Sequence, residues 1–276
     1  MITVVPRFFM PQVLILTHIF LKGVIRDKIL RVLVLSGLGF LVLAPFVSFF
    51  SMRQVHQLLI TITLSWISLN LLFLTLMLGS SSIWKDMEKR WLYAVFGLPV
   101  KRSSYVISRL LTIIITLAGC GVALAGLGAL LIAVVGDTYS TALDFTWGGY
   151  WVACAFMLLK YMLLTAIVLL FSSVSTSLFL PVFGTFSVYL AGSASQGVMD
   201  YVTGVGAPQT TWLVQVAAKA LYYLLPNFSV FDLTTAAIYG LPIDFIHLLW
   251  VGGYFVVYTS LVIWVAVVCF NQRELK

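Results

Sequence analysis

Charged residues are scarce in this sequence: Lys, Arg, Asp and Glu make up 9% of the 276 residues, whereas 62% are hydrophobic. So little polar surface cannot cover the core of a water-soluble protein of this size. The scarcity therefore excludes a soluble globular protein and predicts one whose solvent is lipid. Apolar runs such as 110–135 do not alternate with polar residues, so they favour transmembrane helices over a β-barrel.

Residues that bind metals or phosphates are also few. The three histidines are far apart, and the three cysteines, which lack the C-x-x-C spacing of metal sites, lie in apolar runs: Cys120, Cys154 and Cys269. The sequence contains no G-x-x-x-x-G-K-[ST] phosphate-binding loop. We therefore expect no metal, no cofactor and no catalytic site on this chain.

Six apolar stretches are long enough to cross a bilayer, since about 20 residues suffice for a helix. They cover residues 31–50, 58–79, 110–135, 150–171, 178–195 and 245–270. We predict a single all-helical transmembrane domain over residues 1–276. The third stretch has small residues at every fourth position, a pattern that lets helices approach closely in lipid: Gly121, Ala125, Ala129 and Ala133.

Two further helical segments are predicted outside these spans. Residues 12–30 place His18, Lys22 and Arg26 on one helical face, which indicates a helix lying in the membrane interface. A simple extension of the first span explains the same residues and stays open. A short external helical segment is expected between spans five and six, where a proline turn ends one helix and Asp232 caps the next.

Positive charge is concentrated in alternate connections. The segments before residue 32, from 80 to 109 and after 270 hold thirteen Lys and Arg against four Asp and Glu, whereas the other connections hold two against five. Because cytoplasmic loops retain Lys and Arg, both termini are predicted to be cytoplasmic. Topology thus explains the net charge of +7 without any nucleic-acid partner.

The segment 80–109 is the most polar connection between two spans. It mixes charges of both signs with Trp84, Trp91 and Tyr93, and then breaks at residues 97–99 (Gly-Leu-Pro). Such a mixture suits an interface with a soluble partner protein. A solvated turn that carries cytoplasmic charges is the alternative interpretation.

Two short motifs carry a resemblance to a known family. Pro-Val-Lys-Arg at 99–102 follows the charged segment, and Leu-Pro-Asn-Phe at 225–228 precedes the last span. With the N-terminal amphipathic helix and the order of spans, they resemble a type-2 ABC transporter permease over nearly the whole chain. In that family the loop before the proline commonly carries a Glu pair and a Gly-Thr turn, where this chain has Asp86 and Glu88 followed by Lys-Arg-Trp at 89–91.

The resemblance implies a partner and roles for several residues. The charged segment would be the coupling helix, which sits in a groove of an ATPase subunit and contacts it through Lys85, Asp86, Glu88, Lys89, Arg90, Pro99 and Arg102. ATP and Mg would bind that ATPase. Two copies of the chain, or one copy and a related permease, would enclose an export path in the bacterial inner membrane. A short external helix pair would close the exit, with Pro226, Asn227 and Asp232 in this gate.

Lys160 is the one charge in the interior of a predicted span, where a charge costs about 3 kcal/mol or more. It is expected to face protein or water, either lining the path and contacting an anionic part of the substrate, or merely snorkelling or bonding a neighbouring helix. The sequence does not distinguish whether the substrate is a lipid, a glycan, a peptide or a drug-like compound. Two other functions stay open: a membrane-embedded lipid-modifying enzyme, and a scaffold subunit of a membrane complex.

Overall fold

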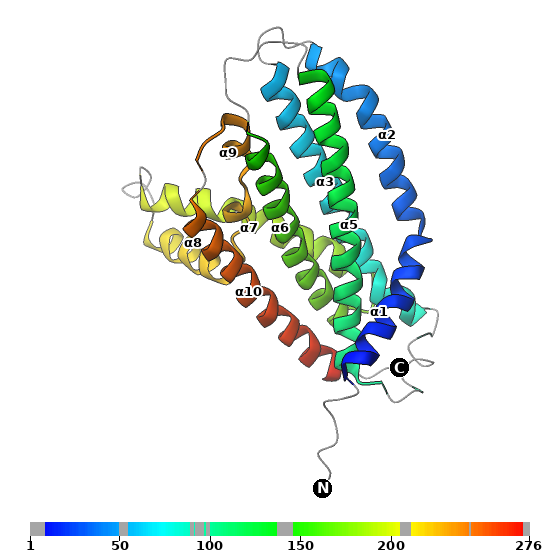
Figure 1. Ribbon diagram of the computed structural model, residues 1–276. Coiled ribbons are helices and arrows are strands. Elements are labelled where there is room, and N and C mark those ends of the chain that lie inside the picture. Colours follow the sequence, from blue (N-terminus) through cyan, green and yellow to red (C-terminus); the bar gives the residue numbers. More distant parts are fainter. Residues whose placement is uncertain are drawn as a thin grey trace.

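The computed structural model describes residues 9–49, 55–88, 91, 97, 100–136, 146–204, 211–242 and 244–272. All regular elements of these residues are helices, as predicted (Figure 1). They are α1 (Phe9–Ile25), α2 (Lys28–Phe49), α3 (Val55–Glu88), α5 (Arg102–Gly136), α6 (Trp147–Val174), α7 (Phe179–Thr203), α8 (Trp212–Leu224), the 3-10 turn η2 (Ser229–Phe231), α9 (Thr234–Tyr239) and α10 (Phe245–Gln272).

Five helices of the described chain are long and apolar enough to cross a membrane: α2, α3, α5, α6 and α10. They correspond to five of the six predicted spans, and they fit an integral membrane protein. The predicted fifth span, 178–195, is also helical, but α7 continues to Thr203 and is not among these five. Its second half contains Ser193, Gln196 and Asp200, which lower its hydropathy. A sixth crossing therefore stays a prediction.

Two helices are much longer than predicted. α3 has 34 residues and α5 has 35, so each is about 50 Å long at 1.5 Å per residue. The hydrocarbon core of a bilayer is only about 30 Å thick. The extra turns of α3 lead to Glu88, and those of α5 begin at Arg102. Both helices therefore continue past the predicted spans 58–79 and 110–135, and much of the charged segment is helix.

A turn at Arg26 and Asp27 separates α1 from α2. The amide of Arg26 donates to the carbonyl of Gly23 at 3.3 Å, and the amide of Asp27 donates to that of Val24 at 2.9 Å. This turn excludes the simple extension of the first span. α1 instead packs along α5 and buries Val13, Leu16 and Phe20, while His18, Lys22 and Arg26 are exposed. The predicted location of α1 in the membrane interface stays a prediction.

The helix at the centre of the bundle is α6. It packs against α3, α5, α7, α9 and α10, and 61% of its most apolar stretch is buried, compared with 17% for α2 and α10. A Cβ atom on Gly121 would lie 2.3 Å from Leu158 Cδ2, so the glycine lets the Leu158 side chain of α6 pack directly on the backbone of α5. Ala125 is buried on the same face, as the small-residue pattern predicts, whereas Ala133 is exposed.

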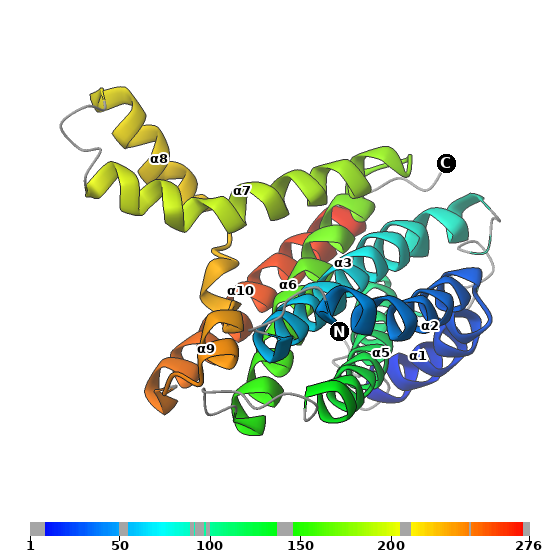
Figure 2. The same cartoon turned by 90° about the horizontal axis from the view of Figure 1, so that it is seen from above.

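Helices α7 and α8 leave the bundle. α7 crosses it obliquely, and its far end forms a hairpin with α8 that projects to one side (Figure 2). α8 packs chiefly against α7, and Ala218 is its buried residue. Most of its apolar side chains are exposed, among them Trp212, Leu213, Tyr223 and Leu224. These surfaces are suited to lipid or to another membrane protein, and not to water.

Candidate functional site

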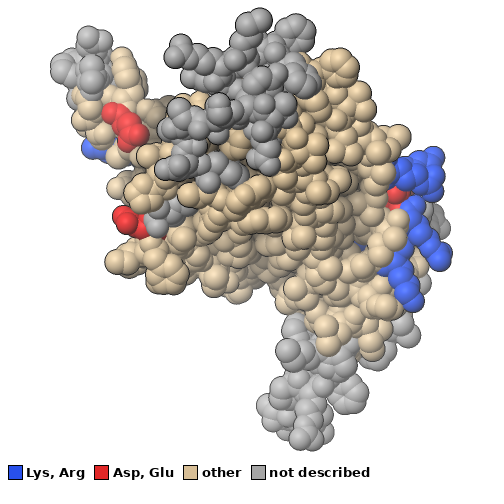
Figure 3. Space-filling model, turned by 45° about the horizontal axis from the view of Figure 1, so that its top comes forward, with Lys and Arg blue, Asp and Glu red and all other residues tan. Residues whose placement is uncertain are grey.

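One end of the bundle carries most of the positive charge, and we call it the basic end. It consists of the turn between α1 and α2, the last turns of α3, the first turns of α5 and the end of α10. Most Lys and Arg side chains visible in Figure 3 lie together at one edge, whereas two acidic groups lie at the opposite edge. The described cations at the basic end with exposed side chains are Lys22, Arg26, Lys28, Arg31 and Lys101.

A buried ion pair lies at the basic end, in what we call the Arg109 cluster: Phe20, Asp86, Tyr105 and Arg109. Arg109 is 8% exposed, and its guanidinium donates to Asp86 Oδ2, which also accepts a hydrogen bond from the Tyr105 hydroxyl. The guanidinium carbon lies 3.6 Å from the ring centroid of Phe20. These contacts join α1, α3 and α5 around one pair of opposite charges, and each charge offsets the desolvation of the other.

Aromatic rings extend the Arg109 cluster in two directions. Phe20 lies edge-on to Trp91, with ring centroids 5.7 Å apart, so the cluster contacts the segment between α3 and α5. Tyr105 stacks on Phe270 with centroids 5.5 Å apart, which adds the end of α10. Trp91 remains 39% exposed. One continuous set of contacts thus links the exposed surface of the basic end to four helices.

The structure places the predicted coupling residues in different environments. Lys85 Nζ lies 2.7 Å from Asp27 Oδ2 in the turn between α1 and α2, and Asp86 belongs to the Arg109 cluster. Glu88 is exposed at the last residue of α3. Arg102 donates to the carbonyl of Asn271 at 3.0 Å. The remaining three, Lys89, Arg90 and Pro99, lie outside the described residues.

Asp27 stabilises the start of α2 as well as pairing with Lys85. Partial burial acts to raise the pKa of Asp27, but the hydrogen bond and charge of Lys85, together with the backbone amides of Ile29 and Lys28, outweigh it and lower the pKa below its ordinary value. The carboxylate therefore stabilises the folded protein at neutral pH. That contribution is lost as the pH falls through the folded-state pKa.

Lys160 lies in the middle of α6 and is 7% exposed. Its Nζ is 5.1 Å from the ring centroid of Tyr161 and 5.8 Å from that of Tyr189 on α7. Tyr161 OH lies 2.5 Å from Ser68 Oγ on α3 and 3.5 Å from Tyr189 OH. We call these four residues the Lys160 cluster. Among the described residues Lys160 forms no ion pair with a carboxylate, so two aromatic faces are its visible electrostatic partners.

The predicted external gate is an ordered joint between α7, α8 and α10. Asn227 is buried. Its backbone amide donates to Tyr254 OH at 3.0 Å, and its side-chain amide donates to Gln196 Oε1 on α7 at 2.7 Å. Pro226 packs so closely on α7 that a Cβ on Gly192 would lie 2.4 Å from its carbonyl oxygen. The exposed Asp232 accepts from the amide of Thr234 at 3.1 Å, a turn contact just before α9; the N-cap residue of that helix is Leu233 and not the predicted Asp232. Whether these residues gate a path stays a prediction.

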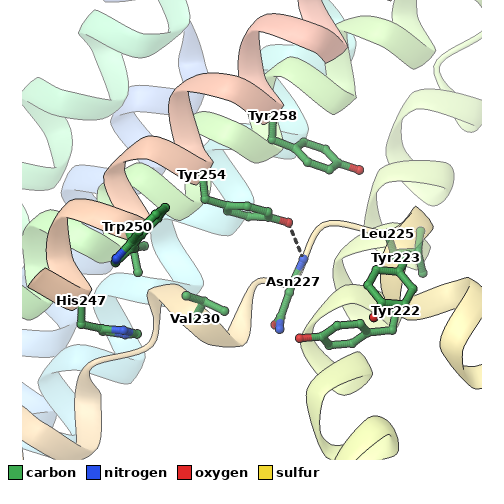
Figure 4. A pocket seen from close by; sticks show the side chains of 10 residues that line it. Tyr222, Tyr223, Leu225, Asn227, Val230, His247, Trp250, Tyr254 and Tyr258 are labelled. Atoms are coloured by element: carbon green, nitrogen blue, oxygen red, sulfur yellow. Dashed lines mark hydrogen bonds between the residues drawn. The ribbon is translucent and has the colours of Figure 1, made fainter.

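A pocket of about 400 Å³ lies between α8 and α10, beside this joint (Figure 4). The Tyr254 and Tyr258 rings extend from α10 toward α8, and Tyr222 extends from α8 toward Asn227 (Figure 4). We call it the aromatic pocket, and its lining is Tyr222, Tyr223, Leu225, Asn227, Val230, His247, Trp250, Val251, Tyr254 and Tyr258. Its volume is within the range of small-molecule sites.

Sequence reasoning missed most of the partners in these sites. It treated Arg109 only as one more cytoplasmic charge and assigned no role to Phe20 or Tyr105. The spacing of four between Tyr105 and Arg109 was a usable signal for a shared helical face. No signal paired Arg109 with Asp86, which is 23 positions away. The aromatic pocket was equally hidden, because its walls come from segments that become neighbours only through the fold.

Acidic and metal-binding side chains do not converge in the part of the chain that the structure describes. No three His, Cys, Asp or Glu side chains there are close enough to hold a metal ion. Asp200 accepts a hydrogen bond from Gln196 one turn away, at 2.9 Å. Compared with known proteins, the chain matches no protein-family model, and no curated protein matches it with significant similarity.

Proposed function

We propose that this chain is the transmembrane permease subunit of an ABC exporter whose ATPase is a separate protein. Two such subunits, identical or related, assemble in the bacterial inner membrane with both termini in the cytoplasm. The observation that carries the proposal is the length of α3 and α5. Both are longer than a bilayer is thick, and the segment 89–101 connects their ends at the basic end.

The basic end has the contacts that a coupling site requires. A push on the segment 89–101 displaces Trp91, whose ring packs on Phe20 of α1. Asp86, in the last turn of α3 just before the segment, is tied to Arg109 of α5, and Tyr105 of α5 stacks on Phe270 of α10. A displacement therefore moves four helix ends together. Rigid-body rocking of packed helices is a common way to switch a transporter between inward-open and outward-open states.

The residues that would transmit force within the chain differ from those that would contact the ATPase. Lys85 and Asp86 are engaged within the chain, so their role is to transmit force and not to grip the partner. Glu88 and Lys101 are exposed at the two edges of the segment, and Trp91 is partly exposed. An exposed pair of opposite charges beside an aromatic ring gives a docking surface both orientation and affinity.

The proposal is tested by purifying the chain from its native membranes under mild conditions. We expect an ATP-binding subunit to copurify in a fixed ratio and to hydrolyse ATP in a vanadate-sensitive manner. Glu88→Lys reverses an exposed charge at the docking surface and should lower the retained ATPase at least fivefold, since contacts of this kind are worth about 1–2 kcal/mol.

The matched control is Asp244→Lys, the same charge reversal at an exposed residue just before α10, at the end remote from the basic end. It should leave the retained ATPase unchanged. A preparation that is active without any nucleotide hydrolase contradicts the proposal. So does an ATPase that stays bound equally well to the Glu88 variant and to the unmodified chain.

A further inference from the structure

The aromatic pocket opens toward lipid and not toward water. One of its walls is the first half of α10, a membrane-spanning helix that leaves most of its surface unburied. Beside the opening, Trp250 is 76% exposed and Leu249 is 61% exposed on α10, and Tyr223 is 78% exposed on α8. In a bilayer such apolar surfaces face acyl chains. A ligand therefore enters the pocket sideways from the membrane.

The lining of the pocket is both apolar and able to form hydrogen bonds. Val230, Val251 and the tyrosine rings provide apolar walls. The Tyr254 hydroxyl accepts a hydrogen bond from the backbone amide of Asn227, so the hydroxyl proton of Tyr254 can be donated to a ligand. The Tyr258 hydroxyl donates to the carbonyl of Leu224 at 3.1 Å, so the lone pairs of this hydroxyl can accept a hydrogen bond from a ligand. His247 adds a polar group at the exposed start of α10.

This combination suits one kind of occupant. A molecule with an apolar chain covers the valines and the ring faces, and a polar head on the same molecule satisfies the hydroxyls and His247. An apolar side chain inserted from a second copy of this protein would leave the remaining capacity of both hydroxyls unused, namely the proton of Tyr254 and the lone pairs of Tyr258, whereas a polar head would bond to them. The hydroxyls therefore favour an amphiphile over a protein contact.

We propose that the aromatic pocket binds a lipid-like amphiphile that enters from the bilayer between α8 and α10. The amphiphile places its chain along Val230 and Val251 and its head near His247. In naming the substrate class of a permease, the inference rests on the proposed function. Occupancy of the pocket by such a molecule does not depend on an ATPase and is measured without one.

The test uses the full chain in vesicles of phosphatidylcholine, a fraction of which carries a diazirine on one acyl chain. After illumination, mass spectrometry locates the labelled peptides. We expect labelling per residue at 222–230 and 247–258 to exceed that at 33–43 of α2 at least fivefold. α2 is a suitable reference because it is an apolar helix of membrane-spanning length with most of its surface exposed, and it does not line the aromatic pocket.

A pair of substitutions separates the pocket from the general lipid surface. Val230→Phe places a ring in the pocket and should lower its labelling at least fivefold. Val256→Phe makes the same change on an exposed residue of α10 that does not line the pocket, and it should have no effect. Trp250→Ala is a second pocket variant, and it should also lower the labelling; because this side chain is 76% exposed, its removal should disturb the packed core little.

Several outcomes would overturn the inference. Labelling of the pocket no stronger than that of α2 would show ordinary boundary lipid only. Equal labelling of the Val230 and Val256 variants would show that the label lies outside the pocket. Rapid disulfide formation between two Tyr223→Cys chains, with no lipid label, would show a second copy in this place. If an ATPase copurifies but the pocket stays unlabelled, only this inference fails; if the pocket is labelled but no ATPase exists, only the proposed function fails.

Discussion

Replacing Arg109 with Met should destabilise the protein by about 3–5 kcal/mol, the largest effect we expect from any single substitution at the basic end. The side chains of Arg109 and Asp86 are 10% and 13% exposed. Removal of the guanidinium leaves the Asp86 carboxylate buried without its counter-charge, and it also removes the cation from the face of Phe20. Unfolding in mixed micelles with increasing SDS gives the change in free energy.

Two further variants make this prediction specific. Arg102→Met removes an arginine from the same helix at a more accessible position and should cost only about 1 kcal/mol, because its hydrogen bond to the carbonyl of Asn271 is exposed and water can replace the guanidinium. The double variant Asp86→Leu, Arg109→Met removes both charges and should be more stable than Arg109→Met alone. A neutral Arg109→Met variant, or a double variant less stable than the single one, would contradict the account.

Replacing Lys160 with Met should reduce function strongly without loss of stability. Lysine and methionine have similar shapes, and the change removes a buried charge from the membrane interior, so the free energy of unfolding should stay the same or rise. If Lys160 binds an anionic head of the substrate, the lost charged hydrogen bond is worth about 1.5–3 kcal/mol, which corresponds to at least a tenfold weaker response.

The measurement is the stimulation of ATP turnover in the purified complex by oleate, an anionic amphiphile, compared with monoolein, a neutral one. Lys160→Met should weaken the response to oleate at least tenfold and leave the response to monoolein unchanged. Lys160→Arg keeps the charge and should retain most of the response to oleate. An unchanged oleate response in the methionine variant would end the role of Lys160 as a binding residue.

The helical architecture could be predicted from the composition and from the length of the apolar runs. In lipid the backbone must satisfy its own hydrogen bonds, and a continuous apolar run does so by forming a helix. The same reasoning located the ends of α6 and α10 within a few residues. It placed the boundary between the amphipathic helix and the first span at residues 30 and 31, a few residues after the turn that the structure has at Arg26 and Asp27. The four-residue spacing that begins at Gly121 correctly indicated a close helix contact, although it did not name α6 as the partner.

The sequence did not predict the full lengths of α3 and α5, the direction of α7 or the contacts between distant segments, and each has its own physical reason. The continuations of α3 and α5 carry charges, so a search for apolar spans ended too early. The direction of α7 depends on its packing against the Asn227 joint, where Gly192 admits Pro226 and Phe228, and a sequence pattern does not encode a crossing direction. The pairing of Asp86 with Arg109 and the tyrosines of the aromatic pocket are contacts between distant segments, which only the assembled fold brings together.

The central claim is that the basic end faces the cytoplasm, where an ATPase acts on the segment 89–101, and the accessibility of single cysteines tests it most directly. In a chain whose native cysteines are replaced by alanine, Glu88→Cys and Thr211→Cys each place one thiol on an exposed residue, at the basic end and at the start of α8. We expect a membrane-impermeant maleimide applied to intact spheroplasts to label the cysteine at 211 and to label the one at 88 only after permeabilisation. Labelling of the cysteine at 88 in intact spheroplasts would contradict the account.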